Sequence, residues 1–200
     1  MLFIVAIGAG LCAIMLAFVT RAGHIQHWDD GLEVWMDPFR ARWLRAASVA
    51  TLPGEWFAHY GIGLVLAAVL VATRQGAMRA IVPPLFLASL GATLFHHAVK
   101  FVYRRVRPDV AVKRNKTEPA FPSGHTTNAT AVLATGAFML VHLDLMPAPL
   151  AIVGVIIICA CVGASRVALG WHWGSDVVGG WLSGTAVACL CSALFLALSA

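Results

Sequence analysis

Three short stretches of this chain contain most of the residues whose types suit phosphate chemistry. They are KFVYRRVRP (Lys100 to Pro108), PSGH (Pro122 to His125) and SRVALGWHWGSD (Ser165 to Asp176). Together they offer cations that can hold a phosphoryl group, histidines that can attack it or donate a proton, and a carboxylate. The rest of the chain is largely apolar, so we expect a phosphate-handling site in a membrane-bound protein.

The third motif has the most specific pattern. His172 and Asp176 are four residues apart and would share one side of a helix. A carboxylate that holds one imidazole nitrogen fixes the tautomer and leaves the other nitrogen free as a nucleophile. Arg166 adds a planar fork for phosphate oxygens. A buried His–Asp pair that merely closes a helix junction is the alternative, and it leaves Arg166 unexplained.

The PSGH motif reads as the start of a helix. Free N–H groups and the positive end of the helix dipole make such a start an anion site. Gly124 allows the backbone to approach a ligand closely, Ser123 adds a hydroxyl donor, and His125 could protonate a departing oxygen. On its own the motif is weak, because a capped helix start with an incidental histidine would look the same.

The first motif is a basic segment framed by Lys100 and Arg107, which we predict to bind phosphate as a point charge and a planar fork. For the other cations nearby, contact with anionic lipid headgroups is the better interpretation. These are Arg104, Arg105, Lys113, Arg114 and Lys116.

Metal chemistry is not expected, and no cofactor is predicted. Asp176 is assigned to His172, while Asp109 and Glu118 stand alone in a basic loop. Lys100, Arg107 and Arg166 can supply the charge neutralisation that metal ions supply in other phosphoryl-transfer sites.

Composition predicts an all-α, polytopic membrane bundle. The chain has 200 residues, 60% hydrophobic and 12% charged, about half the charge of a soluble domain. We expect six spans in one domain, residues 1–200, with all three motifs on one side of the membrane. The spans are residues 2–20, 59–74, 80–99, 124–142, 149–165 and 176–198.

Several smaller features bear on this arrangement. Residues 1–20 are interpreted as a retained span rather than a secretion signal. Pro83 and Pro84 suit the first turn of the third span. The five cysteines are interpreted as packing or lipid-facing residues. Residues 21–58, rich in tryptophan and arginine, predict one or two helices lying on the membrane. That segment is either an anchoring hairpin or a lateral wall of the lipid entry.

The three motifs, written K-x6-RP, PSGH and SR-x5-H-x3-D, resemble those of the type 2 phosphatidic acid phosphatase superfamily, which includes soluble acid phosphatases and vanadium haloperoxidases. The resemblance covers Lys100 to Asp176. The six-span plan points to the membrane-bound lipid phosphatases.

The resemblance implies a role for each motif residue. His172 would form a phosphohistidine, Asp176 would orient it, and His125 would protonate the leaving group. The phosphate would be held by Lys100, Arg107, Ser123, Gly124 and Arg166.

The implied partners are the lipid bilayer and a lipid phosphate or diphosphate, with no nucleic acid. Candidate substrates are phosphatidylglycerophosphate, phosphatidate, undecaprenyl diphosphate and lipid A phosphates; oligomeric state stays open. His96 and His97 either contact a second phosphate or, more simply, pack in the bundle.

The resemblance favours the cell inner membrane with a periplasmic site. Counting positive charges favours the opposite orientation, because the motif side is basic and the other side offers little beyond Arg74 and Arg79. We follow the resemblance, since an anionic substrate and headgroups account for much of that charge.

Three other functions fit the sequence less well. A transporter or flippase would need ionisable residues at mid-membrane in several spans, and most spans here lack them. A decayed relative would lack a motif residue, and none is missing. A haloperoxidase fits poorly with the membrane setting.

Overall fold

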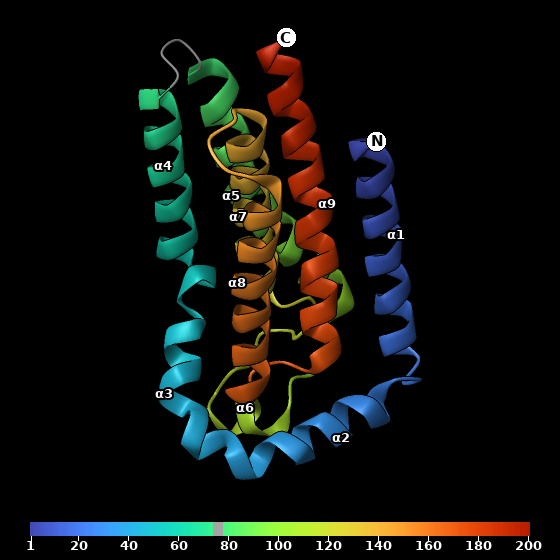
Figure 1. The fold of residues 1–200 in the computed structure, drawn as a ribbon. Coiled ribbons are helices and arrows are strands. Elements are labelled where there is room, and N and C mark those ends of the chain that lie inside the picture. Colours follow the sequence, from blue (N-terminus) through green and yellow to red (C-terminus); the bar gives the residue numbers. More distant parts are fainter. Residues whose placement is uncertain (74–77) are drawn as a thin grey trace.

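The computed structural model describes residues 1–73 and 78–200, and within them the secondary structure is helical (Figure 1). The helices are α1 (Leu2–Arg21), α2 (Gln26–Met36), α3 (Arg40–Ala50), α4 (Trp56–Thr73), α5 (Met78–Tyr103), α6 (Asp109–Lys113), α7 (Gly124–His142), α8 (Ala148–Ala168) and α9 (Gly174–Ser199). Two short 3-10 turns, η1 (Asp37–Phe39) and η2 (Leu52–Gly54), precede α3 and α4. The predicted all-α membrane bundle is confirmed.

Long helices occupy all six of the predicted spans, although the boundaries shift by a few residues. Among the described residues, five of them are long and apolar enough to cross a membrane, namely α1, α4, α5, α8 and α9. The sixth, α7, is the helix that opens with PSGH, and its first turns are polar. Thr126, Thr127 and Asn128 there are buried, so neighbouring helices rather than lipid surround them.

Helix α7 lies inside the bundle and packs against α4, α5, α8 and α9. Its approach to α9 is close because α9 carries glycines where the two helices meet. A Cβ atom at Gly184 would lie 2.6 Å from the carbonyl oxygen of Thr127, and one at Gly180 would lie 2.9 Å from that of Ser123. Small residues at such positions let helices in a membrane pack backbone to backbone.

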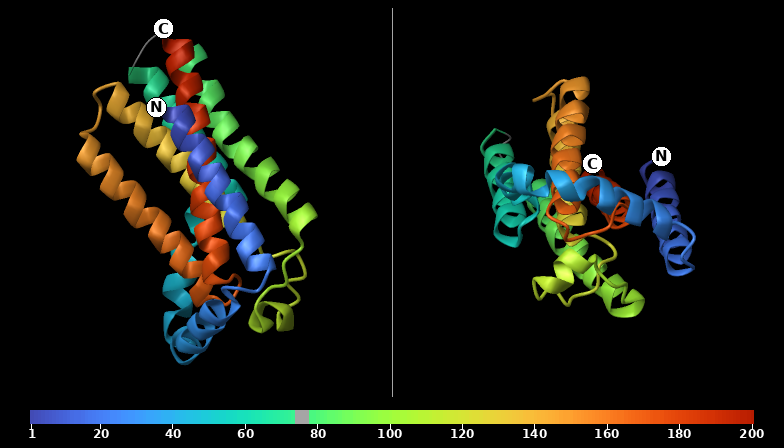
Figure 2. Two further views of the ribbon diagram at one scale, coloured as in Figure 1. Left: turned by 90° about the vertical axis from the view of Figure 1, so that its right-hand side faces the viewer. Right: turned by 90° about the horizontal axis from the view of Figure 1, so that it is seen from below.

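The chain ends lie at one end of the bundle, and α2, α3 and α6 lie at the other (Figures 1 and 2). Helix α2 runs across that end beneath the upright helices, as the predicted surface helices of residues 21–58 should. The three motifs meet at this same end, because α5 ends there, α7 begins there, and the connection from α8 to α9 turns there. The predicted one-sided placement of the motifs is therefore confirmed.

One detail differs from expectation. Helix α5 is already formed at Met78, so Pro83 and Pro84 lie inside the helix rather than in its first turn. Residue 74, which ended the second predicted span and carried part of the charge count for the opposite side, lies outside the described residues. The cysteines are free, as expected for packing residues.

Candidate active site

Six of the eight predicted site residues line one cavity of about 220 Å³ at the motif end of the bundle. They are Lys100, Arg107, Gly124, His125, Arg166 and His172. The other two, Ser123 and Asp176, are fully buried beside it, each with 0% of its surface exposed. Three segments that lie apart in the sequence thus converge on one small polar space.

His172 sits in the loop between α8 and α9. The loop leaves α8 through Gly170, whose positive φ of 67° is a conformation that glycine adopts without strain. Asp176 lies in the first turn of α9, and its Oδ2 is 3.4 Å from Nδ1 of His172. The other imidazole nitrogen, Nε2, lies 3.3 Å from Nη1 of Arg107, which lines the cavity. Nε2 is therefore the imidazole nitrogen that lies beside a cation of the cavity, and its role as the nucleophile stays a prediction.

Burial and the nearby positive charges of Arg107, Arg166 and Lys100 lower the pKa of His172 well below its ordinary value. The side chain is almost inaccessible, with 2% exposed, so the imidazolium would lose its hydration without gaining a full counter-charge. A neutral imidazole has a free lone pair on one nitrogen. The environment thus keeps His172 in the form that a nucleophile requires.

Asp176 is shared among more partners than the sequence indicates. Its Oδ2 accepts a hydrogen bond from the backbone N–H of Trp173 at 2.9 Å, and its Oδ1 accepts one from Nη1 of Arg105 at 2.7 Å. The prediction that Asp176 serves His172 alone was wrong. The carboxylate also caps the start of α9 and binds Arg105.

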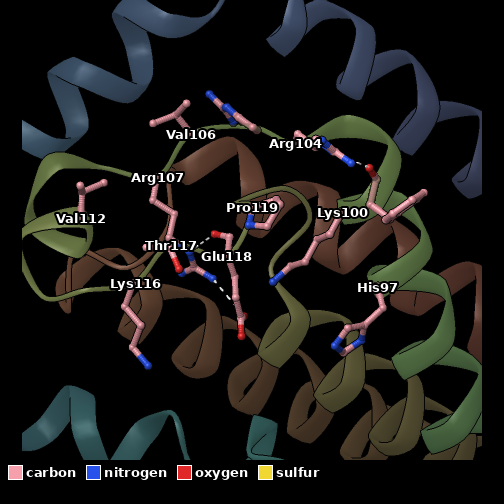
Figure 3. Close-up of a pocket in the computed structure, with 12 residues that line it drawn as sticks. His97, Lys100, Arg104, Val106, Arg107, Val112, Lys116, Thr117, Glu118 and Pro119 are labelled. Carbon is pink, nitrogen blue, oxygen red and sulfur yellow. Dashed lines mark hydrogen bonds and ion pairs between the residues drawn. The ribbon is translucent and has the colours of Figure 1, made fainter.

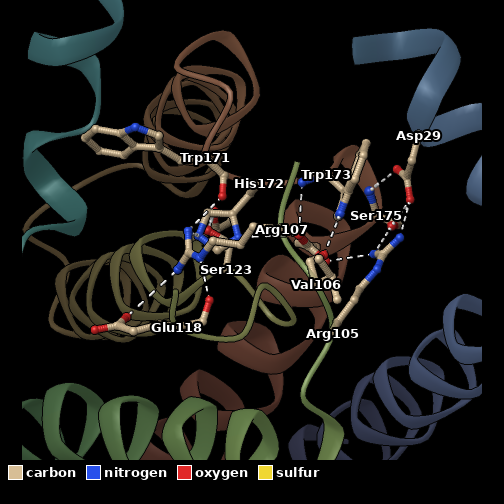
Figure 4. Close-up of polar contacts among 12 residues, drawn as sticks. Asp29, Arg105, Val106, Arg107, Glu118, Ser123, Trp171, His172, Trp173 and Ser175 are labelled. Carbon is tan, nitrogen blue, oxygen red and sulfur yellow. Dashed lines mark hydrogen bonds and ion pairs between the residues drawn. The ribbon is translucent and has the colours of Figure 1, made fainter. Parts of the chain in front are cut away.

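The two cations of the first motif reach the cavity from different directions. Lys100 lies in the last turn of α5 and is 8% exposed. Arg107 is held by two carbonyl oxygens: Nε donates to that of Glu118 at 2.6 Å and Nη1 to that of Trp171 at 2.7 Å. Figure 4 shows the guanidinium between Glu118 and His172. Fixing a cation in this way means that little rearrangement is needed when an anion enters.

Arg166 projects from the last turn of α8. Its Nη1 donates to Oγ1 of Thr51 at 2.7 Å, and its guanidinium stacks on the ring of Trp171, 4.3 Å from the centroid. With 4% of the residue exposed, it is a buried charge at a position where phosphate would neutralise it.

The PSGH motif forms the N-terminus of α7, as its sequence predicts. Gly124 is packed tightly: a Cβ atom there would lie 2.8 Å from Nε2 of His96. The hydroxyl of Ser123 accepts a hydrogen bond from Oγ1 of Thr126 at 2.9 Å, and its role as a phosphate donor stays a prediction. His96 and His97 both line the cavity, and contact of either with a second phosphate stays a prediction.

Arg105 is the clearest residue that the sequence analysis misjudged. We interpreted it as a contact for headgroups, but its side chain is 8% exposed and lies between two carboxylates. Nη1 is 2.7 Å from Oδ1 of Asp176. Nη2 is 2.7 Å from Oδ2 of Asp29 in α2, and Figure 4 shows Arg105 beside Asp29. Asp29 also accepts hydrogen bonds from the backbone N–H and the hydroxyl of Ser175. Burial lowers the pKa of Arg105, but the two carboxylates outweigh it and raise the pKa overall.

A larger cavity of about 640 Å³ adjoins the first (Figure 3). Lys100, Arg107, Lys116 and Glu118 line both spaces, and Arg104 lines the larger one. The exposed cations Arg104 and Lys116 thus border the approach to the site. Contact with headgroups stays the prediction for them.

Residues 21–58 form part of the site. Asp29 binds Arg105, Thr51 binds Arg166, and Glu55 and Trp56 line the smaller cavity. These contacts favour the lateral wall of the lipid entry over a separate anchoring hairpin, and that role stays a prediction. No local pattern in the sequence connects these residues to the motifs.

The structure is thus a membrane helical bundle that holds buried cations, two histidines and a carboxylate at one end. Residues 82–199 match the model of the PAP2 superfamily, and the chain belongs to that family. The resemblance drawn from the three motifs is therefore confirmed.

Two comparisons identify individual proteins of this family to which the chain is similar. It is 39% identical over 94 residues to phosphatidylglycerophosphatase B of Bacillus subtilis (strain 168), a match that spans 46% of each chain. The match therefore covers about half the length of that curated relative. Its fold is also similar to the crystal structure of a transmembrane PAP2-type phosphatidylglycerolphosphate phosphatase from Bacillus subtilis. There the TM-score is 0.84, with 26% identity and 94% of each chain covered.

Proposed function

We propose that this protein is an integral-membrane lipid phosphatase that hydrolyses a phosphomonoester or diphosphate through a phosphohistidine intermediate. The observation that carries the proposal is the placement of His172. Its buried Nε2 lies 3.3 Å from Arg107 in a cavity shared with Lys100, Arg166 and His125. A neutral nucleophile, three cations and a second histidine are the parts that phosphoryl transfer to an imidazole requires.

In the first step Nε2 of His172 forms a bond to phosphorus while the bond from phosphorus to the lipid oxygen breaks. The electron pair of the broken bond goes to that oxygen, and His125 supplies its proton, so that the product leaves as an alcohol or a lipid monophosphate. Lys100, Arg107 and Arg166 balance the charge on the phosphoryl oxygens. Asp176 faces Nδ1 of His172 and stabilises the positive charge that develops on the ring.

In the second step water attacks the phosphorus and gives a proton to His125. The bond from nitrogen to phosphorus then breaks, its electron pair returns to His172, and inorganic phosphate is released. Protons and charges balance without a further reactant, so turnover should continue in EDTA.

The name of the Bacillus relative makes phosphatidylglycerophosphate the first substrate to test. Phosphatidate, undecaprenyl diphosphate and lipid A phosphates complete the panel. A transporter is less favoured, because the buried cations gather at one end of the bundle rather than along a path through it.

We further propose that the protein resides in the cell inner membrane with the site facing the periplasm. The first and last residues lie at the end of the bundle opposite the motifs (Figure 1). A fluorescent protein that matures only in the cytoplasm, fused after residue 200, should therefore fluoresce. A dark fusion together with an active alkaline phosphatase fusion at the same position would reverse the orientation.

The activity is tested by phosphate release from the lipid panel, using protein purified in detergent, in EDTA, with His172→Ala as the control. Release by the wild type alone supports a metal-independent phosphatase, and the preferred lipid identifies the substrate. Folded wild-type protein that releases no phosphate from any lipid would overturn the proposal.

A further inference from the structure

The η2 turn between α3 and α4 packs directly on the first turn of α7. A Cβ atom at Gly54 would lie 2.6 Å from Cβ of His125 and 2.7 Å from its carbonyl oxygen, so only a glycine fits there without movement. Thr51, at the start of the turn, is 4% exposed and holds Arg166. The turn is therefore fixed against two of the predicted site residues.

This packing brings the carboxylate of Glu55 to the second histidine. Oε1 of Glu55 lies 3.0 Å from Nε2 of His125, and the two side chains are 30% and 23% exposed. Burial alone would raise the pKa of Glu55, but contact with His125 and the charges of Arg166 and Lys116 lower it overall. Glu55 is thus an anion at neutral pH, and it lines the same cavity as His125.

A protonated His125 needs such an anion. Lys100, Arg107 and Arg166 line the cavity, and their charges oppose a further positive charge on an imidazole. Asp176 cannot provide the balance, since it is already bound to Arg105 and the start of α9. A carboxylate on one nitrogen of a histidine also fixes its ring and the position of its proton.

We propose that Glu55 is the positioning residue of His125, pairing with Nε2 so that the other nitrogen, Nδ1, exchanges protons with the substrate and water. The proposal rests on the function proposed above. In the first step Glu55 stabilises the imidazolium that protonates the leaving oxygen, and in the second it stabilises the imidazolium formed when water is deprotonated. Glu55 itself neither gains nor loses a proton. The chain would then hold each histidine with its own carboxylate, Asp176 for His172 and Glu55 for His125.

The test compares Glu55→Gln, His125→Ala and the double variant on two substrates. One is a lipid phosphomonoester, whose alkoxide is a poor leaving group, and the other is an aryl phosphate whose phenolate leaves without protonation. We expect Glu55→Gln to lower kcat on the lipid by roughly 10- to 100-fold, a part of what a general acid contributes, and to lower formation of the phosphoenzyme from the aryl ester by no more than about threefold. The double variant should lose no more than His125→Ala alone, since both changes remove one function.

Asp144→Asn is the matched control. It makes the same change of carboxylate to amide on an exposed residue between α7 and α8, where φ is 57° and asparagine is well tolerated. It should behave as the wild type does. Gly54→Ala is a second variant, which displaces the turn but keeps the carboxylate. It should show the same dependence on the leaving group as Glu55→Gln, and thermal unfolding would verify that both are folded.

Three results would each overturn the inference. They are a wild-type kcat in Glu55→Gln, equal losses of rate on both substrates, and losses of rate that multiply in the double variant. None of these results would affect the proposed function, which depends on wild-type activity and on its loss in His172→Ala. If the wild type itself proves inactive, the proposed function fails and the inference fails with it.

Discussion

The two parts of the chain contribute to the candidate site in different ways. Residues 78–200 carry all three motifs and the whole of the family match, and they supply the groups that would touch phosphate. Residues 1–73 carry no motif, yet they supply a partner for three of the charged groups around the cavity: Asp29 for Arg105, Thr51 for Arg166, and Glu55 for His125. The difference between the two parts indicates that residues 78–200 would carry out the chemistry, whereas residues 1–73 hold charged side chains in place.

The largest effect should come from His172, at the centre of the second part. His172→Ala removes the nucleophile, and we expect kcat for phosphate release to fall by at least about 10⁴-fold, as in other enzymes that lose a catalytic nucleophile. The readout is phosphate release under saturating lipid. A variant that retained a tenth of wild-type activity would require another nucleophile.

His125→Ala should have a smaller and more selective effect. Without a proton donor, cleavage of a lipid phosphate should slow by about 10² to 10⁴-fold, while substrates with good leaving groups should lose less. Single-turnover rates for a series of leaving groups give the measurement. Equal losses across the series would contradict the acid role.

Arg105 connects the two parts of the chain, because it forms ion pairs with Asp29 and Asp176. Replacing it tests that connection. Arg105→Gln leaves the buried carboxylates of Asp29 and Asp176 facing one another without their shared cation. Removing one partner of a buried ion pair typically costs about 3–5 kcal/mol of stability. Thermal unfolding in detergent should therefore show a large decrease, and phosphate release should fall with it because Asp176 loses a partner. An unfolding temperature equal to that of the wild type would show that the network adds nothing to stability.

The smallest effect is a change in pH dependence. His172 must be neutral to attack, and its pKa lies well below the ordinary value of about 6.5. Activity should therefore persist as the pH falls through 6.5, and the acid limb set by His172 should appear only as the pH falls through its lowered pKa. The stability contribution has the same sign. It is fully present above the unfolded value of about 6.5 and decreases below it, because the unfolded state binds a proton that the folded state resists.

After burial, the charge of Arg107 contributes most to that lowered pKa of His172. Arg107→Gln should move the acid limb of the single-turnover rate to higher pH, whereas Arg107→Lys, which keeps the charge, should move it less. An acid limb that stays in place in both variants would remove Arg107 from the control of His172.

The same contrast explains what the sequence could predict. His172 and Asp176 are near neighbours in the chain, and the order of spans brings Lys100, His125 and Arg166 to one end, so motif spacing was enough for them. Asp29 and Arg105 are 76 residues apart, and Glu55 reaches His125 through a turn in a different part of the chain. Such pairs depend on how α2 and η2 pack across the bundle, which neither periodicity nor motif spacing describes. For that reason Arg105 was mistaken for a surface cation, and the roles of Asp29 and Glu55 were missed.

The central claim is that His172 carries the phosphoryl group during turnover. It is tested most directly by rapid quenching of the wild-type enzyme with lipid labelled in the scissile phosphate, followed by mass spectrometry of the labelled peptide. The account predicts a phosphate that is stable in base, labile in acid and attached to His172, and its absence from His172→Ala. Phosphate release at the wild-type rate with no label on His172, in samples quenched throughout the first turnover, would contradict it.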